Sequence, residues 1–354
     1  MSSVRRAAWL ALSALVTIAA TGCGGASGRP HDAAGSKLHL APTTDLAQAA
    51  AIVWLIDVAP RELVAHAELL PAIDTLFPHD RVAAFAERNG FDPLALEELT
   101  LASYASAEGE TMLYLARGAL NPAKLESIFR ARTGGVDGRG IDRQGEQEII
   151  RTWGTVRQSR AQIATFGRDA AALEVGRFGP LRAAELFAEG RLKRASPALK
   201  TPALARAEEL SRESEAAGQA APDSEVAPLR AFALGPFEGE SAKGLGGLLA
   251  ASTAAAIVAR PATVGDHAAL RITLILVGGW GADAPKAADR LAAAFDALSA
   301  TSLGRLSGLD HPLNLVRVEP LPDALRLTVA LDALGLARGA RAAMGAEVSE
   351  IMSY

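Results

Sequence analysis

Residues 254–278 read AAAIVARPATVGDHAALRITLILVG and contain two apolar runs separated by the polar turn PATVGDH, residues 261–267. In the second run, apolar residues occupy every second position: Leu270, Ile272, Leu274 and Leu276. Arg271 and Thr273 stand between them, so the apolar side chains share one face of an extended strand. Two such runs around a short turn predict an antiparallel hairpin.

Similar pairs of runs occur elsewhere in the chain. LTLASYAS (99–106) and TMLYLARG (111–118) flank AEGE, and PLNLVRVEPL (312–321) precedes ALRLTVALD (324–332). A further pair is expected at about 146–153 and 159–166. The apolar, β-branched run AAIVWLIDV at 50–58 predicts the first strand of the fold.

Helical patterns follow the hairpins. NPAKLESIFRAR (121–132) opens with Asn121 in the N-cap position and proline at the first helical position. ADAPKAADRLAAAFDAL (282–298) has Asp283 as the expected cap. Its expected core stripe has helical spacing: Ala287, Leu291, Phe295 and Leu298. Another helix is expected at 180–189.

The alternation of hairpins and helices predicts an α+β protein in which helices cover antiparallel sheets. Each half is read as a β-β-α-β-β-α repeat after an initial strand, although residue identity between the halves is slight. The expected organisation is a signal peptide (1–22), a flexible tether with a lipidated cysteine (23–45), a first α+β half (46–210), a linker (211–228), a second α+β half (229–345) and a C-terminal tail (346–354).

The start of the chain has the layout of an export signal. Arg5 and Arg6 precede an uncharged apolar run at 9–20, and the small residues Thr21 and Gly22 follow it. The run is shorter than the roughly 20 residues that a spanning helix needs. The only cysteine of the chain, Cys23, comes next, and a lone free thiol in an oxidising compartment would be a liability.

Ala20-Thr21-Gly22-Cys23 resembles the lipobox of bacterial lipoproteins. The resemblance implies that lipoprotein signal peptidase cuts before Cys23 and that this residue carries the lipid. The usual leucine three positions before the cysteine is replaced by Ala20, and an ordinary secretory signal with a chance cysteine is the alternative. Gly24 in place of aspartate implies sorting to the outer membrane, at its periplasmic face or on the cell surface. Composition also resembles that of lipoproteins from GC-rich diderm bacteria such as myxobacteria.

Composition narrows the class of partner. Without residues 1–22, the chain keeps 34 basic and 40 acidic residues, and this mild acidity argues against nucleic-acid binding. Aromatic residues make up 5% of the chain, which disfavours a carbohydrate-stacking surface. With 49% hydrophobic residues, the chain is expected to bury a substantial core.

No motif for catalysis or metal binding stands out. GWGADA at 279–284 matches G-x-G-x-x-A, but the strand before it is expected in a hairpin and not in a parallel βαβ unit. The interpretation preferred here is a glycine-rich turn from strand to helix. Four of the six histidines stand beside an aspartate, without H-x-H or H-E-x-x-H spacing: His31-Asp32, His79-Asp80, Asp266-His267 and Asp310-His311. We expect neither a metal nor a cofactor.

Three further groups have ordinary structural interpretations. Glu97-Glu98 and Glu208-Glu209 are expected on solvated helix faces and not in acid–base pairs. The basic run at 191–200 is expected at a helix end, with acidic lipid or polymer as the alternative. Trp54, Trp153 and Trp280 are the large side chains most able to line a pocket, and of these Trp54 is expected in the core. Trp280, between glycines, is the candidate contact residue because we expect its indole to be partly exposed.

The sequence therefore favours a membrane-anchored, non-enzymatic envelope lipoprotein that binds a partner protein or an envelope component. A carrier for an apolar ligand is the first alternative, which a large apolar cavity would distinguish. The second is an envelope hydrolase whose site is assembled from distant residues, with converging polar groups of shifted pKa.

Overall fold

The computed structural model describes residues 38, 40–106, 109–145, 147–156, 158–176, 179–216 and 227–352. The lipobox, Cys23 and His31 lie outside these residues, as does most of the tether. Two compact units are present. Among the described residues, the N-terminal unit comprises the chain up to Arg61 and Asp80–Thr201, and the C-terminal unit comprises Glu62–His79 and the chain from Pro202 onward.

The α-helices are α2 (Thr43–Leu46), α3 (Pro60–Ala65), α4 (Leu70–Leu76), α5 (His79–Asn89), α6 (Pro122–Arg132), α7 (Pro180–Ala188), α8 (Pro202–Ala216), α9 (Ala284–Ser299), α10 (Ser302–Leu306) and α11 (Ala333–Met352). Short 3-10 segments are η1 (Ala67–Leu69), η2 (Ala198–Lys200), η3 (Ser241–Lys243), η4 (Leu245–Ala251) and η5 (Gly281–Asp283). No helix of this part of the chain combines the length and apolar character needed to cross a membrane.

The strands are β1 (Ile52–Val58), β2 (Glu98–Ser106), β3 (Gly109–Arg117), β4 (Val136–Gln144), β5 (Gln147–Val156), β6 (Ser159–Phe166), β7 (Ala170–Val175), β8 (Leu229–Leu234), β9 (Ala254–Val264), β10 (His267–Val277), β11 (Arg317–Pro320) and β12 (Ala324–Asp332). Among the described residues, the strand order is β1-β2-β3-β7-β6-β5-β4 in the N-terminal unit and β11-β12-β10-β9-β8 in the C-terminal unit. The pairings within each unit are antiparallel.

The expected α+β class with antiparallel strands is confirmed, whereas an internal repeat is not shown. In the C-terminal unit, the strands and α-helices after β8 follow in the order β9, β10, α9, α10, β11, β12 and α11. In the N-terminal unit, four strands stand between α6 and α7. The strand pair expected at about 146–153 and 159–166 corresponds to β5 and β6, and the strands β4 and β7 lie before and after it in the chain. The sequence of β4, VDGRGIDRQ, has two glycines and four charged residues, so it lacks the apolar alternation of a typical strand.

The hairpin at 254–278 has longer strands and a shorter turn than expected. Val264 pairs directly with His267, so only Gly265 and Asp266 connect β9 to β10. Gly265 has a φ of +58°, the left-handed region in which glycine carries no steric cost. Residues 261–264 therefore belong to the strand and not to the turn.

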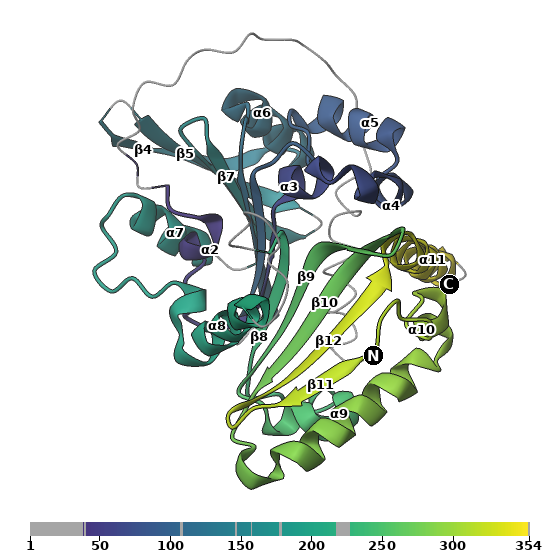
Figure 1. Cartoon of the computed structure of the whole chain (residues 1–354). Helices are drawn as coiled ribbons and strands as arrows, with labels where there is room; N and C mark the ends of the chain where they lie inside the picture. Colours follow the sequence, from purple (N-terminus) through teal and green to yellow (C-terminus); the bar gives the residue numbers. More distant parts are fainter. Residues whose placement is uncertain are drawn as a thin grey trace. The chain divides into compact units, whose positions relative to one another are not determined.

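Each unit has helices on both faces of its part of the sheet (Figure 1). In the C-terminal unit, α9 contacts β11 and β12, while α8 contacts β8, β9 and β10 on the opposite face. The α9 face buries Leu276, Leu325 and Leu327 in the main apolar cluster of this unit. In the N-terminal unit, α6 contacts β5 and β6, and α7 contacts β7.

The helix boundaries show local control by capping. The Asn121 side chain accepts a hydrogen bond from the backbone N–H of Lys124 at 3.0 Å, which confirms the expected N-cap of α6. Asp283 occupies the cap position of α9, but its side chain makes no capping hydrogen bond. Of the expected α9 stripe, Ala287 and Leu291 are buried, whereas Leu298 is 41% exposed.

Two expected segment limits differ from the structure. Thr43 is buried, and its hydroxyl lies 2.7 Å from that of Thr100, so ordered structure begins inside the segment interpreted as a tether. Helix α11 continues to Met352, through most of the expected tail. Helix α8 continues to Ala216, into the expected linker 211–228, whose residues 217–226 lie outside the described residues.

Candidate functional site

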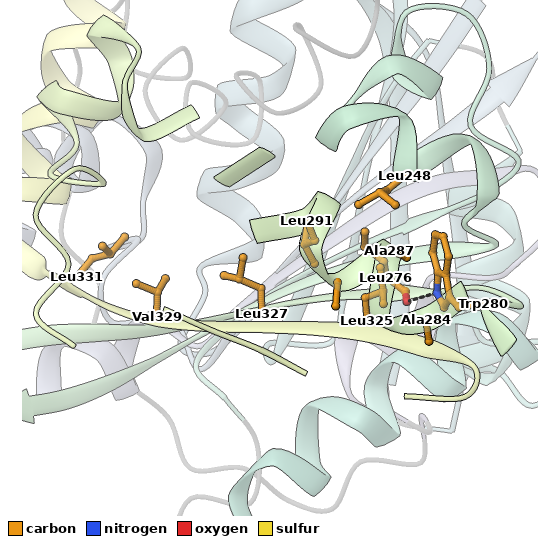
Figure 2. Packing of buried hydrophobic residues seen from close by; sticks show 11 residues of the cluster. Leu248, Leu276, Trp280, Ala284, Ala287, Leu291, Leu325, Leu327, Val329 and Leu331 are labelled. Carbon is orange, nitrogen blue, oxygen red and sulfur yellow. Dashed lines mark hydrogen bonds between the residues drawn. The ribbon is translucent and has the colours of Figure 1, made fainter. Parts of the chain in front are cut away.

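Trp280, the contact residue nominated from sequence, lies in the apolar cluster beneath α9 (Figure 2). Its side chain is 9% exposed, and the indole N–H points to the carbonyl oxygen of Leu276 at 3.5 Å. The expectation of a partly exposed indole is wrong. The neighbouring glycines do not leave the ring in solvent; the ring folds back over Gly278, where an added Cβ would lie 3.2 Å from the indole. A role for Trp280 in contacting a partner stays a prediction, and the burial of its side chain does not support that role.

The GWGADA segment is a turn from strand to helix, as expected. β10 precedes it and pairs antiparallel with both β9 and β12. Segment η5 and helix α9 follow. This arrangement lacks the parallel βαβ crossover in which a glycine-rich turn holds a pyrophosphate.

Trp153 provides a better candidate contact surface. This residue lies on β5, is half-buried, and has the Arg151 guanidinium 5.9 Å from its ring centroid. On the adjacent strand β4, Gly138 and Gly140 pair with Trp153 and Arg151 and add no side chains to this face. We call Arg151 and Trp153, with these two glycines, the Trp153 surface.

Its residue types suit recognition. Tryptophan and arginine are the side chains most enriched at the energetic centres of protein interfaces. The sequence signal for this pair was the spacing of Arg151 and Trp153 by two residues, which places both on one face of a strand. Sequence reasoning missed it because β4, which decides what lies beside them, was not expected.

A second polar group, buried beside α7, contains two carboxylates. Glu174 on β7 and Glu185 on α7 are both 0% exposed. Glu174 accepts hydrogen bonds from the Gln162 side chain and from the backbone N–H groups of Gly179 (3.1 Å) and Leu181 (3.4 Å). The carboxylate therefore binds the first turn of α7, whose N–H groups have no partner within the helix.

Glu185 is held by arginines. Its Oε2 accepts hydrogen bonds from Arg151 and from Arg182, the latter at 2.7 Å, and Arg182 also reaches Asp142 on β4 at 3.2 Å. Its other oxygen, Oε1, has no hydrogen-bond partner in the described residues. Thus the Arg151 side chain links the buried group to the Trp153 surface.

Burial dominates the electrostatics of this group. Loss of hydration raises the pKa of both Glu174 and Glu185, and the negative charge of each nearby carboxylate adds to the effect. Burial, and then the charge of Glu174, likewise raise the pKa of Tyr104. Because neither carboxylate reaches solvent, neither can touch a substrate in this structure. Glu185 orients Arg151, whereas Glu174 holds the start of α7.

The carboxylates singled out in the sequence form ion pairs. Glu97 pairs with Arg61, Glu98 with Arg117, Glu208 with Arg212 and Arg230, and Glu209 with Arg206. In the basic run, Arg191 pairs with Glu189 and Lys200 with Asp45, while Lys193 and Arg194 lie between α7 and η2. Glu97 and Glu98 stand at the start of β2 and not on a helix face, so that expectation is corrected.

The histidines gather no metal site in the described part of the chain, where no cluster of three His, Cys, Asp or Glu side chains has suitable spacing. Among the ion pairs of the described residues, His311 is paired with its sequence neighbour Asp310, at 3.1 Å. Trp54 is buried, as expected. The lipidation residue Cys23 lies outside the described residues.

Comparison with protein-family models gives no match, and comparison with curated proteins gives none either. Two similar solved structures are crystal forms I and IV of TP0453. Form I has a TM-score of 0.45 at 11% identity, covering 87% of this chain and 99% of that chain. Form IV has a TM-score of 0.41 at 10% identity, covering 83% and 94%. At these values, the likeness carries no inference about function.

Proposed function

We propose that this chain is an exported lipoprotein, anchored through Cys23, whose folded part binds a partner protein or an envelope component without catalysing a reaction. The anchor rests on the sequence Ala20-Thr21-Gly22-Cys23 after an apolar run too short to span a bilayer. The outer membrane is the proposed location, on its periplasmic face or at the cell surface.

The observation that carries the binding role is the Trp153 surface. A half-buried tryptophan beside an arginine presents a large, rigid side chain, together with the guanidinium donors that Glu185 does not use, at small entropic cost. Glu185 fixes the Arg151 guanidinium from within the fold. A contact pair held in advance loses less conformational freedom on binding than a free pair does.

The anchor is tested by Cys23→Ser. An alcohol does not replace the thiolate as the acceptor of the lipid, so incorporation of labelled palmitate should be lost and the chain should leave the membrane fraction. The unchanged chain is the control. A Cys23→Ser chain that stays labelled and membrane-bound contradicts the proposal.

The binding role is tested by a photoreactive phenylalanine analogue at position 153. In intact envelopes, illumination should give a discrete cross-linked product. The matched control carries the same analogue at Leu315, which is 92% exposed and lies outside the Trp153 surface. Equal products from both positions, or none from position 153, contradict the assignment of this surface.

A further inference from the structure

Strand β4 is an edge strand of the sheet in the N-terminal unit. Among the described strands it pairs with β5 alone, along one side, so no described strand occupies the hydrogen-bonding groups of its other side. Its residues alternate regularly between exposed and half-buried from Val136 to Arg143. Ile141, a large apolar side chain on this strand, is 43% exposed.

Strand β11, an edge strand of the C-terminal unit, is protected by its length, its sequence and a neighbouring helix. Strand β11 has only four residues and ends at Pro320, whose ring removes a backbone donor. Helix α9 also packs against β11. Short edges, proline and covering helices are the usual means of preventing strand addition. Strand β4 has nine residues and no proline.

The charges of β4 favour pairing with an identical strand. In an antiparallel pair, residues directly opposite each other point to the same face of the sheet. Successive residues of one strand alternate between the two faces. The two-fold axis that relates two copies of the strand must therefore lie midway between one residue and its own copy. An axis at Arg139 or at Asp142 sets that residue opposite its own copy, and an axis at Ile141 sets Arg139 opposite Arg143. Like charges directly opposite one another destabilise a sheet.

An axis through Gly140 avoids each of these oppositions. Arg139 then faces Ile141, over which its aliphatic stem can lie, and Gly138 faces Asp142. Asp137 and Arg143, of opposite charge, face each other at both ends of the pairing. An axis through Gly138 would fall beside the irregularity in β4 between Val136 and Gly138, which disturbs regular pairing.

We infer that two copies of this chain associate through antiparallel pairing of their β4 strands, with Gly140 on the two-fold axis. The regular part of the pairing covers residues 138–142, and the ion pairs of Asp137 with Arg143 close its ends. This association uses the edge of the strand, and it does not depend on the partner proposed for the Trp153 surface.

Residue 140 offers a direct test, because its copies should be neighbours across the axis. Gly140→Cys fits the fold: an added Cβ would lie 3.4 Å from Arg151 and 3.5 Å from Trp153, which are ordinary van der Waals contacts. Treatment of the full chain with a short bismaleimide should then give a covalent dimer. The wild-type chain controls for its only thiol, Cys23.

Gln144→Cys is the matched control on the same strand. In the proposed register its two copies lie eight residues apart, about 27 Å at the rise of an antiparallel strand. We expect at least tenfold more dimer from Gly140→Cys than from Gln144→Cys. Equal yields from folded chains, or a product of mass other than twice the chain, overturn the proposal.

A second pair of variants tests the register. In the Gly140→Cys chain, Ile141→Lys sets a positive charge opposite Arg139 of the other copy, whereas Ile141→Glu sets a negative charge there. Both remove the same apolar contact with Ile150, the β5 partner of Ile141. We expect the dimer yield to fall at least fivefold with lysine and to be retained with glutamate, and equal yields contradict the register.

Sedimentation of the unmodified full chain removes any dependence on the variants. A dimer that dissociates on dilution is the expected result. A wild-type chain that remains monomeric at the highest soluble concentration overturns the inference, even where a substituted chain fails to fold. Thermal melting of each variant identifies those that retain the fold.

Discussion

The indole of Trp153 occupies the space that a side chain at position 138 would need. A Cβ added to Gly138 would lie 2.1 Å from Cζ2 and 2.4 Å from Cε2 of this ring. The two residues pair directly between β4 and β5, so the ring covers a glycine of the edge strand. Aromatic side chains opposite glycines stabilise sheet edges in this way. The fixed ring also explains how a glycine-rich segment remains in the sheet.

We expect Gly138→Ala to destabilise the fold, since the new methyl group would displace the indole or separate the strands. Overpacking of this kind costs about 1–3 kcal/mol of the free energy of unfolding. Gly140→Ala is the control, because its Cβ would stand at 3.4–3.5 Å from the nearest side-chain atoms. Urea denaturation measures both. A Gly138→Ala chain as stable as Gly140→Ala would show that the indole does not lie over Gly138.

Glu174 should make stability depend on pH in an unusual direction. Burial raises the pKa of this carboxyl above its ordinary value near 4.5, so the folded state binds the proton more tightly than the unfolded state does. Its contribution to stability is therefore full below pH 4.5 and is lost as pH rises through the folded-state pKa. Deprotonation leaves a carboxylate in a site where solvent does not reach it.

Glu174→Gln tests this sign. The amide keeps an acceptor for the N–H groups of Gly179 and Leu181, and Gln162 can turn its own amide to match. We expect the variant to gain stability relative to wild type at pH 7 and to lose this advantage near pH 4. Denaturation series at several pH values measure the difference. If the stability difference between the variant and wild type did not depend on pH, the pKa of Glu174 would not be raised in the folded state.

The contrast between β10 and β4 explains how much of the fold could be predicted. β10 alternates Leu270, Ile272 and Leu274 with polar residues, so period-two patterning alone identified it. β4 has no such pattern, because its stability comes from Trp153 on a neighbouring strand and from ion pairs such as that of Arg139 with Glu126 at 2.7 Å. Contacts between distant residues leave no local signal in one sequence.

The candidate surface was missed for the same reason. Trp280 and Trp153 both stand near glycines in the sequence, and nothing local distinguishes them. Helix α9 and segment η4 bury the first, whereas the second lies half-buried over Gly138 of the edge strand β4 and beside Arg151. Exposure of an aromatic residue follows from packing between elements, which periodicity does not reveal. The expected cap at Asn121, by contrast, depends on residues three positions apart and was predictable.

The segment 211–228 remains the predicted site of first proteolytic cleavage. Its residues are mostly polar or small, so the chain offers few apolar contacts there. Leu210, just before it, is fully buried, and Arg206 binds Asp323 through two hydrogen bonds of 2.8 and 3.2 Å. We therefore expect early cuts after residue 212, identified by mass analysis of limited digests. If the first cuts fell inside 270–300 while 211–228 resisted cleavage, the prediction that 211–228 is the linker between the two halves would be wrong.

Trp280→Ala should destabilise the protein strongly, because the indole packs with Leu248 and Ala284 beneath α9 (Figure 2). Truncation of a buried tryptophan costs roughly 3–5 kcal/mol through lost contacts and the cavity that remains. Trp153→Ala is the matched control: its half-buried ring fills less of the interior, so the loss of unfolding free energy should be smaller. Thermal and urea unfolding of both variants, with photo-cross-linking at position 153 as the readout of binding, separate the two roles. If Trp280→Ala unfolds like wild type, its indole does not support the core, and the contact role first expected for this residue returns.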